Sequence, residues 1–414
     1  MSVWPTVKLS ALATFRNGLN FAANARGKGL AIVGVRDFQD RSFVRYDDLE
    51  ELNPDALSSR DSLIAKNDII FVRSNGNREL IGRSLFVAEA PPKPTSHSGF
   101  TIRLRFTDQR ALPQFFAYQL RGEIVRKLLS SRGGGTNINN LSQGILGDLD
   151  VTLPPLWEQA RIAEILGAYD DLIEVSRRRV ALLEEMSSSL FEEWFVRFRF
   201  PGHDGQAVTD EKGPLPPGWT WAAFSTLADF LNGYAFKPSD FQSDGLPIVK
   251  IPELKNGVSS KTPLNDGKNV PARLHLNTGD LLFSWSGTLA VSEWTGGAAL
   301  LNQHLFRVQP KIHWHRGFIR QALRSALVRF DSQGVGATMK HIRRAALDDT
   351  YVAVPPVGPL SLTADRMFSK FYDQIIVVRQ QMQILAASRD LLLPRLISGK
   401  LSVAEAEREL AQAA

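Results

Sequence analysis

Long cationic and amide side chains are frequent in the segments between the hydrophobic stretches of this chain. Arginine can donate two hydrogen bonds to the edge of guanine, and Asn or Gln can pair in the same way with adenine. For each such residue, a phosphate contact or a plain solvated surface position is the alternative interpretation. Candidates in the first half are Arg36, Arg41, Arg45, Arg73, Asn75, Asn77, Arg78 and Arg83, with Arg132, Asn137 and Asn139 in a glycine-bearing loop. Candidates in the second half are Lys250, Lys255, Lys261, Trp285, Ser286, Gln303, His304, Lys340, His341, Arg343 and Arg344.

Motifs for enzymatic chemistry on DNA are missing from the sequence. The amino-methyltransferase tetrad needs Asn or Asp before its two prolines, but Leu153 precedes Pro154 and Val354 precedes Pro355. No G-x-x-x-x-G-K-[ST] loop for ATP occurs. Pro54-Asp55 suggests a nuclease motif, yet no acidic-x-Lys partner stands nearby. The sequence therefore predicts a chain without catalytic, metal-ligand or cofactor residues of its own.

Three further patterns each allow more than one interpretation. His313 and His315 have the spacing of two metal ligands on a strand, but without Cys or a third ligand they suit exposed polar positions. The glycines at 133–135 and at 334 and 336 suit either a backbone-contact loop or a plain turn. Arg177-Arg178-Arg179 suits a solvated helix face or an ion pair between helices, with phosphate contact as a further possibility.

An internal repeat determines where these residues lie. The segment from Trp4 to Phe21 aligns with that from Trp219 to Phe236, and both contain an Asn-Gly pair. Residues 67–74 align with 279–286, and residues 131–155 align with 332–356 without a gap. The intervening segments differ in length and share few residues. The chain therefore consists of two copies of one unit. Because the surfaces of the copies differ, we expect that any ligands of the two copies differ as well.

Each copy has the pattern of an α+β domain with a mostly antiparallel sheet. Short β-type runs separated by turn residues come first, and a helical stretch follows at 113–131 and at 315–330. We predict two target-binding domains at 1–152 and 219–354, long helices at 153–200 and 355–402, a linker at 201–218 and a short, weakly anchored helix or tail at 403–414.

The two long helices are indicated by their apolar spacing. After Pro154-Pro155, apolar residues recur every three or four positions as far as Trp194, and after Pro355-Pro356 they follow heptad a and d spacing from Phe368 to Leu396. Helices of about 40 residues span on the order of 60 Å and need a partner of similar length. We therefore expect the two helices to form an antiparallel coiled coil.

Composition limits the class of protein. The chain has no cysteine, which excludes disulfides and fits a reducing cytoplasm, and it shows no apolar run long enough to cross a membrane. Residues 1–150 carry 20 basic against 15 acidic side chains and residues 201–354 carry 16 against 13, whereas residues 151–200 carry 6 against 9. This distribution favours nucleic acid as the ligand of the two domains.

The segments PPLWEQARIAEIL at 154–166, AYDDLIE at 168–174 and LLLPRLISGKL at 391–401 resemble the DNA specificity subunits of type I restriction-modification systems. The resemblance covers nearly the whole chain, although the second Pro-Pro pair has no Glu-Gln after it. It implies a non-catalytic subunit with two target-recognition domains, each reading one half of an asymmetric bipartite DNA target, on helices that set the spacing.

The same resemblance implies the partners. Methyltransferase subunits, two in number, would dock around the helices, with Glu158 and Gln159 as candidate contacts, and an ATP-dependent restriction subunit would join them. S-adenosylmethionine, magnesium and ATP would be bound by those partner subunits. A two-headed scaffold that binds proteins instead of DNA is the alternative from another class.

Overall fold

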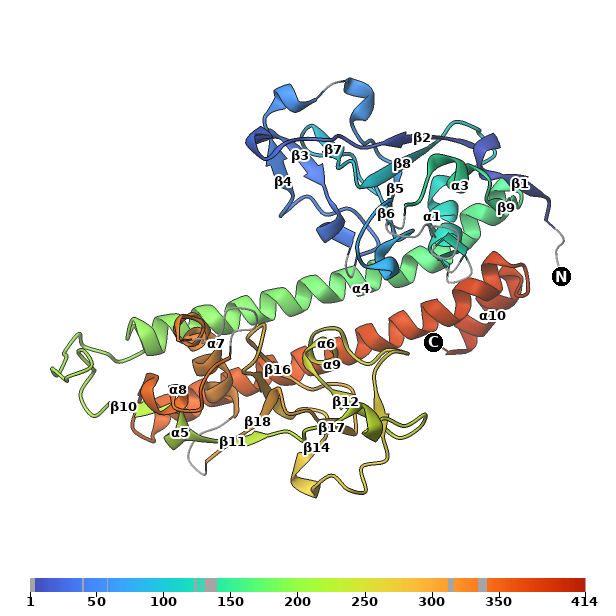
Figure 1. Cartoon of the computed structure of the whole chain (residues 1–414). Helices are drawn as coiled ribbons and strands as arrows, with labels where there is room; N and C mark the ends of the chain where they lie inside the picture. The colour runs from blue at the N-terminus through green and yellow to red at the C-terminus, as the bar shows by residue number, and fades with distance from the viewer. Residues whose placement is uncertain are drawn as a thin grey trace. The chain divides into compact units, whose positions relative to one another are not determined.

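The computed structural model describes residues 4–38, 41–57, 59–122, 125–126, 128–129, 140–311, 316–333 and 341–413. The chain forms two compact units, Met1–Asp171 with Ala386–Ala414, and Leu172–Leu385. Each unit contains one copy of the sequence repeat and part of both long helices (Figure 1). The long helices are thus divided between the units, whereas the sequence suggested a separate spacer. The predicted functional division into two readers and a spacer stays a prediction.

Unit 1 is built on two small sheets. A four-stranded antiparallel sheet has the order β2-β8-β5-β6, and a three-stranded sheet has the order β4-β3-β7, in which β3 and β7 run parallel. The pair β1-β9 closes the unit next to the start of α4. The strands are β1 (Thr6–Lys8), β2 (Ala13–Asn17), β3 (Arg26–Val33), β4 (Glu50–Leu52), β5 (Ile69–Val72), β6 (Ser84–Phe86), β7 (Thr95–His97), β8 (Thr101–Phe106) and β9 (Asp150–Thr152). The helices are α1 (Pro113–Arg121), α3 (Gln143–Gly147) and the first part of α4 (Leu156–Phe191).

Unit 2 repeats this plan. The sheet β11-β18-β15-β16 matches the four-stranded sheet of unit 1, and β13-β12-β17-β14 again contains one parallel pair, β12 with β17. Its strands are β10 (Thr220–Ala223), β11 (Ala228–Asn232), β12 (Leu246–Val249), β13 (Leu264–Asn265), β14 (His275–Leu276), β15 (Leu281–Ser284), β16 (Ala290–Glu293), β17 (Ala299–Leu301), β18 (Leu305–Pro310) and β19 (Tyr351–Val354). Its helices are α5 (Phe224–Leu227), α6 (Ile251–Asn256), α7 (Arg316–Ser332), α8 (Ala346–Asp349) and most of α9 (Pro359–Ile397). The predicted α+β class, mostly antiparallel, is confirmed.

The Asn-Gly pairs of the repeat serve a close approach of two backbones, not a hairpin turn. A Cβ on Gly18 would lie 2.2 Å from the carbonyl oxygen of Ser98, and one on Gly233 would lie 2.2 Å from that of Asn302. Each glycine follows the last residue of an edge strand, β2 or β11. Only glycine leaves room for this approach, which explains why both copies carry it.

An arginine at the same place in both sheets fixes the loop before the central strand. Arg103 on β8 donates to the carbonyls of Asp61 and Leu63, at 2.6 and 2.9 Å. Arg307 on β18 donates to those of Arg273 and His275, at 3.0 and 3.2 Å. These charged donors satisfy backbone groups inside each unit, so both arginines belong to the framework.

Helices α4 and α9 pack against each other within both units. In unit 1, Ile162 and Leu166 near the start of α4 share a core with Leu392 and Leu396 near the end of α9. In unit 2, the end of α4 shares a core with the first half of α9, including a hydrogen bond of 2.9 Å between the Ser187 and Tyr372 hydroxyls. Residue numbers rise along one helix as they fall along the other. The predicted antiparallel pairing is therefore confirmed.

The ends of the long helices differ from the sequence expectation. α4 begins at Leu156 and gives way at Phe191 to a π-helical turn, Glu192–Val196, where Phe195 is buried against Trp219 and Phe318. The last residues of the helix predicted at 153–200 thus belong to a π-helical turn and a loop.

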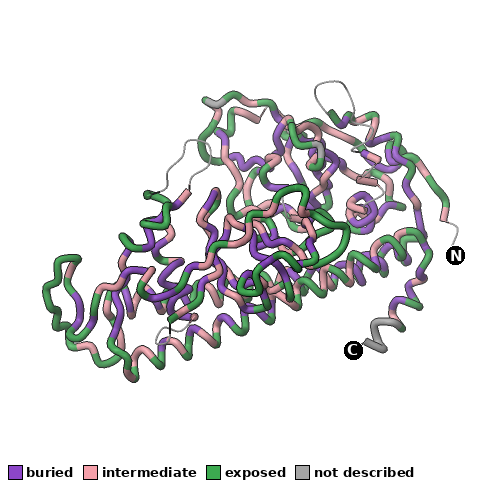
Figure 2. The backbone as a smooth tube through the Cα atoms, turned by 60° about the horizontal axis from the view of Figure 1, so that its bottom comes forward, coloured by how far each residue is buried: buried purple, intermediate pink, exposed green. Residues whose placement is uncertain are grey.

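The C-terminal residues form a short helix, one of the two forms expected, but they are anchored more firmly than expected. They form helix α10 (Val403–Ala413), in which Ala406 is fully buried in the core of unit 1 and Glu407 forms an ion pair with Arg161. Figure 2 shows the buried residues along the backbone.

Candidate nucleic-acid interface

The two units bring equivalent residues together at one edge of their sheets. In unit 1, the N–H of Arg73, directly after β5, donates to the carbonyl of Phe100 at 2.8 Å, and the N–H of Leu141 donates to the carbonyl of Arg73 at 2.8 Å. In unit 2, Trp285 is bonded to His304 at 3.4 Å, and Ile342 to Trp285 at 2.9 Å, through the same backbone groups. We call this place the strand-end edge. It comprises residues 73–77, 98–100 and 140 in unit 1, and 285–288, 302–304 and 341 in unit 2.

Backbone pairing confirms that these positions correspond. Ser74 bridges to Asn140, and Ser286 bridges to His341. The N–H of Ser98 donates to Val33 at 3.0 Å, and that of Asn302 donates to Val249 at 3.1 Å. The framework is therefore the same in both units, while the side chains that it carries at this edge differ.

In unit 1, the strand-end edge carries cationic and amide groups. The Asn75 amide oxygen accepts the N–H of Asn77 at 2.7 Å, and the Asn77 amide oxygen accepts that of Glu79 at 3.0 Å. Arg73 is half-buried, with its guanidinium 3.5 Å from the carbonyl of Gly99. The two Asn residues thus shape the loop after β5, which ends in the short helix Arg78–Leu80.

In unit 2, aromatic and imidazole rings take these positions. The Trp285 ring lies 5.6 Å from the ring of His341 and 6.2 Å from that of His304, and its indole N–H donates to the carbonyl of Gln303 at 3.0 Å. Burial lowers the pKa of His304, and the charges of His341 and Lys250 lower it further. A neutral imidazole has one donor and one acceptor, the pairing groups that base edges require.

The other candidates are distributed around this edge. Arg36 is exposed after β3 and donates to the carbonyl of Asp48 at 3.0 Å, and Arg344 donates to the carbonyl of Phe230 at 3.3 Å. Lys250 lies with its ammonium 4.8 Å from the ring centre of Phe241. The remaining residues lie in loops or on a short helix outside the strand-end edge: Arg41, Arg45, Arg83, Lys255, Lys261 and Arg343.

Several candidates lie outside the residues that the structure describes. These are Arg132, Asn137, Asn139 and Lys340, the two glycine-bearing loops, and the His313 and His315 pair. The backbone of Arg78 is described, but its side chain is not. DNA contact by any of the candidate residues stays a prediction.

Glu158 and Gln159 point into unit 1. Gln159 is fully buried, and its amide bridges the N–H of Leu112 at 2.8 Å to the carbonyls of Arg110 and Pro154 at 2.8 and 2.7 Å. Glu158 is 8% exposed and accepts the indole N–H of Trp4 at 3.0 Å. The Glu158-Gln159 pair therefore links the start of α4 to the part of unit 1 that precedes it in the sequence. Its role in partner binding stays a prediction.

The arginine run on α4 is solvated. Arg177 and Arg178 lie within 3.7 and 3.5 Å of Glu174 on the same helix, and their side chains are 43% and 74% exposed. Of the interpretations given above, the solvated face is confirmed, and the ion pairs of Arg177 and Arg178 with Glu174 lie within one helix. Phosphate contact by this run stays a prediction.

Sequence reasoning missed Ser98, Phe100 and Asn302 at the strand-end edge. Ser98 and Phe100 flank the turn between β7 and β8, and Asn302 follows β17, so that only strand pairing places them beside residues 73 and 285. The one signal in the sequence was that Phe100 and His304 stand at the same distance before the hydrophobic residues of the next strand.

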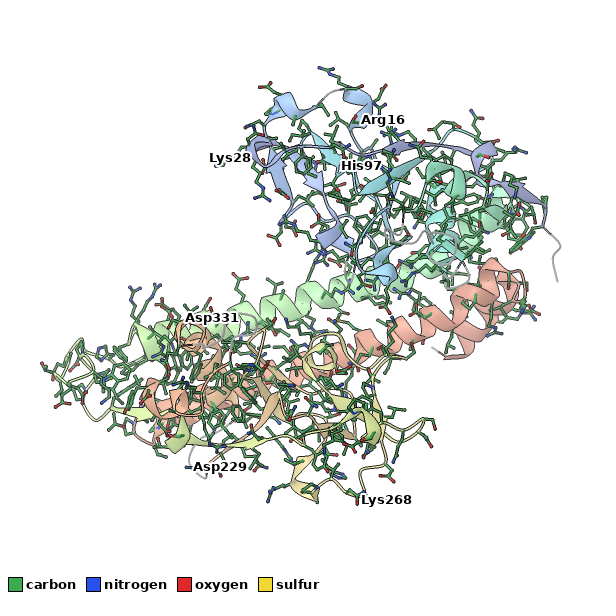
Figure 3. All side chains as sticks on the ribbon, in the orientation of Figure 1. Arg16, Lys28, His97, Asp229, Lys268 and Asp331 are labelled. Carbon is green, nitrogen blue, oxygen red and sulfur yellow. The ribbon has the colours of Figure 1, made fainter. Side chains whose placement is uncertain are left out.

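Among the described residues, no three His, Cys, Asp or Glu side chains gather closely enough to hold a metal ion. Within the same part of the chain, no helix combines the length and hydropathy of a membrane span. His97, labelled in Figure 3, is fully buried, and burial together with nearby arginines lowers its pKa to about 3.

Comparison with known proteins agrees with this architecture. Residues 1–185 match the family model of the type I restriction modification DNA specificity domain. The MjaIX specificity subunit of a type I restriction enzyme from Methanocaldococcus jannaschii is 24% identical over 77% of this chain and 76% of its own length. The EcoAI specificity subunit from Escherichia coli is 40% identical over 57% of this chain and 42% of its own.

A solved structure supports the fold. The S subunit of a type I restriction-modification system from M. genitalium superimposes with a TM-score of 0.55 at 13% identity, covering 95% of this chain and 96% of that one. The DNA specificity domain thus falls on the first of two repeated α+β units, each of which contains part of both long helices. Residues 1–185 therefore belong to the type I restriction modification DNA specificity domain family, and the similar curated proteins are specificity subunits of type I restriction enzymes.

Proposed function

We propose that this chain gives a type I restriction-modification complex its DNA sequence specificity. Unit 1 reads one half of a bipartite target and unit 2 reads the other, and α4 with α9 sets the interval between the halves. The single observation that supports two different half-sites is the strand-end edge, where one backbone framework presents Arg73 and Asn140 in unit 1 but Trp285 and His341 in unit 2. Since bases are recognised by the groups presented to them, unlike edges select unlike sequences.

We also propose that the chain acts without catalysis of its own, in the cytoplasm, together with two methyltransferase subunits and a restriction subunit. The missing methyltransferase and ATP motifs support a non-catalytic role. S-adenosylmethionine, magnesium and ATP would then be bound by the partners.

Mapping methylated adenines tests this function directly. The chain is expressed with its methyltransferase subunit in a host that lacks other adenine methylation, and the modified sites are sequenced. We expect one split motif with two unlike halves. Replacing Trp285 and His341 together by Ala should relax or abolish recognition of one half-site and leave the bases of the other half unchanged.

Two outcomes would contradict the proposal. Loss of both half-sites in the Trp285→Ala, His341→Ala variant, with unit 2 still folded, would show that the units do not read independently. If the complex with the methyltransferase binds duplex DNA without the steep loss of affinity in salt that phosphate contacts cause, the chain is a protein-binding scaffold.

A further inference from the structure

A pocket opens at the strand-end edge of unit 1. It has a volume of about 540 Å³ and lies between the end of β3, the loop after β5 and the turn that joins β7 to β8. Phe21, Ile32 and Val35 contribute apolar surface, and Phe100 lies at the same wall with 63% of its surface exposed. An exposed aromatic ring beside a concave apolar surface is an arrangement that binds flat ligands by stacking.

A buried hydroxyl without a partner lines the same pocket. Ser98 is 5% exposed, and its Oγ has no hydrogen-bond partner among the described residues. Its backbone is fully engaged, since the N–H donates to Val33 at 3.0 Å and the carbonyl accepts the N–H of Thr101 at 2.9 Å. Buried polar atoms are almost always paired, and a ligand in the pocket could supply a donor or acceptor to this hydroxyl.

The charges around the pocket indicate what kind of ligand fits. Glu50 lines it and accepts a hydrogen bond of 2.7 Å from Arg26, and Arg36 and Asn75 line it as well. Arg26 and Arg36 offset the charge of Glu50, so net charge does not choose between a base and a phosphate. The Glu50 carboxylate can accept hydrogen bonds from an exocyclic amino group, as acidic side chains do with cytosine, and together with the apolar surface this favours a base.

Two glycines lie at the wall of the pocket. Gly34 and Gly76 line the pocket; a Cβ on Gly76 would meet no atom within 4 Å, and one on Gly34 would meet nothing closer than the Asp37 carboxylate at 3.8 Å. Neither glycine has a positive φ. Backbone conformation therefore does not require glycine at either position, and the space beside both residues is open.

Unit 2 fills the equivalent positions with its own side chains. Lys250 directly follows β12 as Gly34 follows β3, and its ammonium lies over Phe241 at 4.8 Å. Asn302 stands in the place of Ser98, and its amide oxygen accepts the N–H of His304 at 3.3 Å. The residue of unit 2 at the position of Ser98 thus already has a hydrogen-bond partner for its side chain.

We propose that this pocket binds a single unstacked nucleobase that carries an amino group, with its ring against Phe100 and its polar edge at Ser98 and Glu50. The inference rests on the proposed function if the base comes from the DNA target. A free nucleotide is a second source of the same chemistry. Displacing a base from a duplex costs a few kcal/mol, least where the base has no pairing partner, and stacking on an aromatic ring offsets much of that cost.

The test uses the chain in complex with its methyltransferase and a duplex of the mapped target. Each base of the first half-site is placed in turn opposite an abasic site, and binding is measured by fluorescence anisotropy. At one position other than the methylated adenine we expect about tenfold tighter binding, because a base opposite an abasic site is already unpaired. Phe100→Ala should remove this gain and weaken cognate binding roughly 5- to 150-fold, as loss of one stacked base does.

Three variants serve as controls. Phe100→Trp keeps an aromatic face and should retain the gain, whereas Ser98→Ala should reduce it with little effect on folding. Val258→Ala removes an exposed apolar side chain from unit 2, where Val258 is 48% exposed, and should change nothing. Hydrogen exchange of unit 1 in each variant checks that the fold is intact.

A second arm separates the two sources. Adenosine, cytidine and their monophosphates are titrated into the complex without DNA. Binding that Phe100→Ala abolishes, with no response in the abasic scan, assigns the pocket to a free nucleotide. If neither arm depends on Phe100, the proposal is overturned. If the complex fails to bind any duplex, the proposed function fails, and the nucleotide titration still decides whether the pocket binds a base.

Discussion

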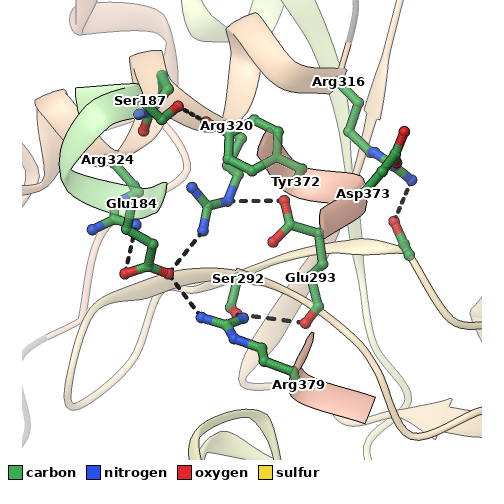
Figure 4. A network of polar contacts seen from close by, with 12 residues as sticks. Glu184, Ser187, Ser292, Glu293, Arg316, Arg320, Arg324, Tyr372, Asp373 and Arg379 are labelled. Atoms are coloured by element: carbon green, nitrogen blue, oxygen red, sulfur yellow. Dashed lines mark hydrogen bonds and ion pairs between the residues drawn. The ribbon is translucent and has the colours of Figure 1, made fainter. Parts of the chain in front are cut away.

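Arg320 is the residue of unit 2 whose replacement we expect to cost most stability. It is fully buried on α7, with its Nε 2.8 Å from the Glu293 carboxylate on β16, its Nη2 3.3 Å from Glu184 on α4, and its guanidinium 4.1 Å from the ring centre of Tyr372 on α9 (Figure 4). Burial alone would lower the pKa of Arg320, but the neighbouring Glu293, Tyr372 and Glu184 raise it overall. The cation therefore holds the sheet and both long helices together.

The loss of stability in an Arg320 variant depends mainly on the Glu293 carboxylate. Its side chain is fully buried, and its contact with Arg320 is short but too bent for a hydrogen bond, so the attraction is mainly between charges. Arg320→Met leaves this carboxylate in the interior without its partner, which costs about 3 to 5 kcal/mol. Glu184 still has Arg324 at 3.2 Å and Arg379 at 2.8 Å. The loss therefore arises at Glu293.

Hydrogen-exchange mass spectrometry over a range of urea concentrations measures this, following peptides from β16 and α7. With a urea dependence of about 2 to 3 kcal/mol per molar, the unfolding midpoint of unit 2 should fall by roughly 1 to 2.5 M. Adding Glu293→Gln to Arg320→Met should recover part of the loss, because the buried charge is removed.

A matched control comes from the same network. Arg324 contacts Glu184 but is 28% exposed, so Arg324→Met should cost about 1 kcal/mol or less. The reasoning is refuted if Arg320→Met costs no more than this control, or if the double variant is less stable than Arg320→Met alone.

Two further predictions concern the shared framework and the helices. Gly18→Ala and Gly233→Ala each force a Cβ to within 2.2 Å of a backbone oxygen, so each should destabilise its own unit by about 1 to 3 kcal/mol in thermal unfolding. Gly76→Ala, with open space around its Cβ, should have no such effect, and equal losses in all three would contradict the steric argument. Inserting one helical turn in both α4 and α9 where the chain passes between units, after Asp171 and after Leu385, should lengthen the methylated motif by about one to two base pairs, since a turn rises about 5.4 Å and a base pair about 3.4 Å. A change in the bases themselves would show that the helices do more than set an interval.

The repeat and the long helices were predictable because their signals are local. The Pro-Pro pairs and the three-to-four spacing after them depend only on residues close together in the sequence, and α4 and α9 follow within a few residues of each pair. The alignment of residues 67–74 with 279–286 extends to the backbone, since Asn67 and Gly279 both have positive φ, 75° and 91°.

The candidate site was only partly predictable, because strand pairing between distant segments determines it. Arg73 and Trp285 were found from their residue types after a β run, but Ser98 and Phe100 reach the same place only through the pairing of β3 with β7 and of β5 with β8. The inward direction of Gln159 likewise depends on Leu112 and Arg110, which lie more than 40 residues earlier in the chain. Composition and periodicity carry no information on such contacts.

The hydrogen bonds that Arg103 on β8 and Arg307 on β18 donate to backbone carbonyls stabilise each unit, and no side chain of the strand-end edge takes part in them. Exchanges at 73, 98, 100 and 140, or at their counterparts, thus leave the supporting bonds untouched. If the units read DNA as proposed, exchanges at one strand-end edge can change the preference of that unit without removing these bonds, and the other unit keeps its own preference.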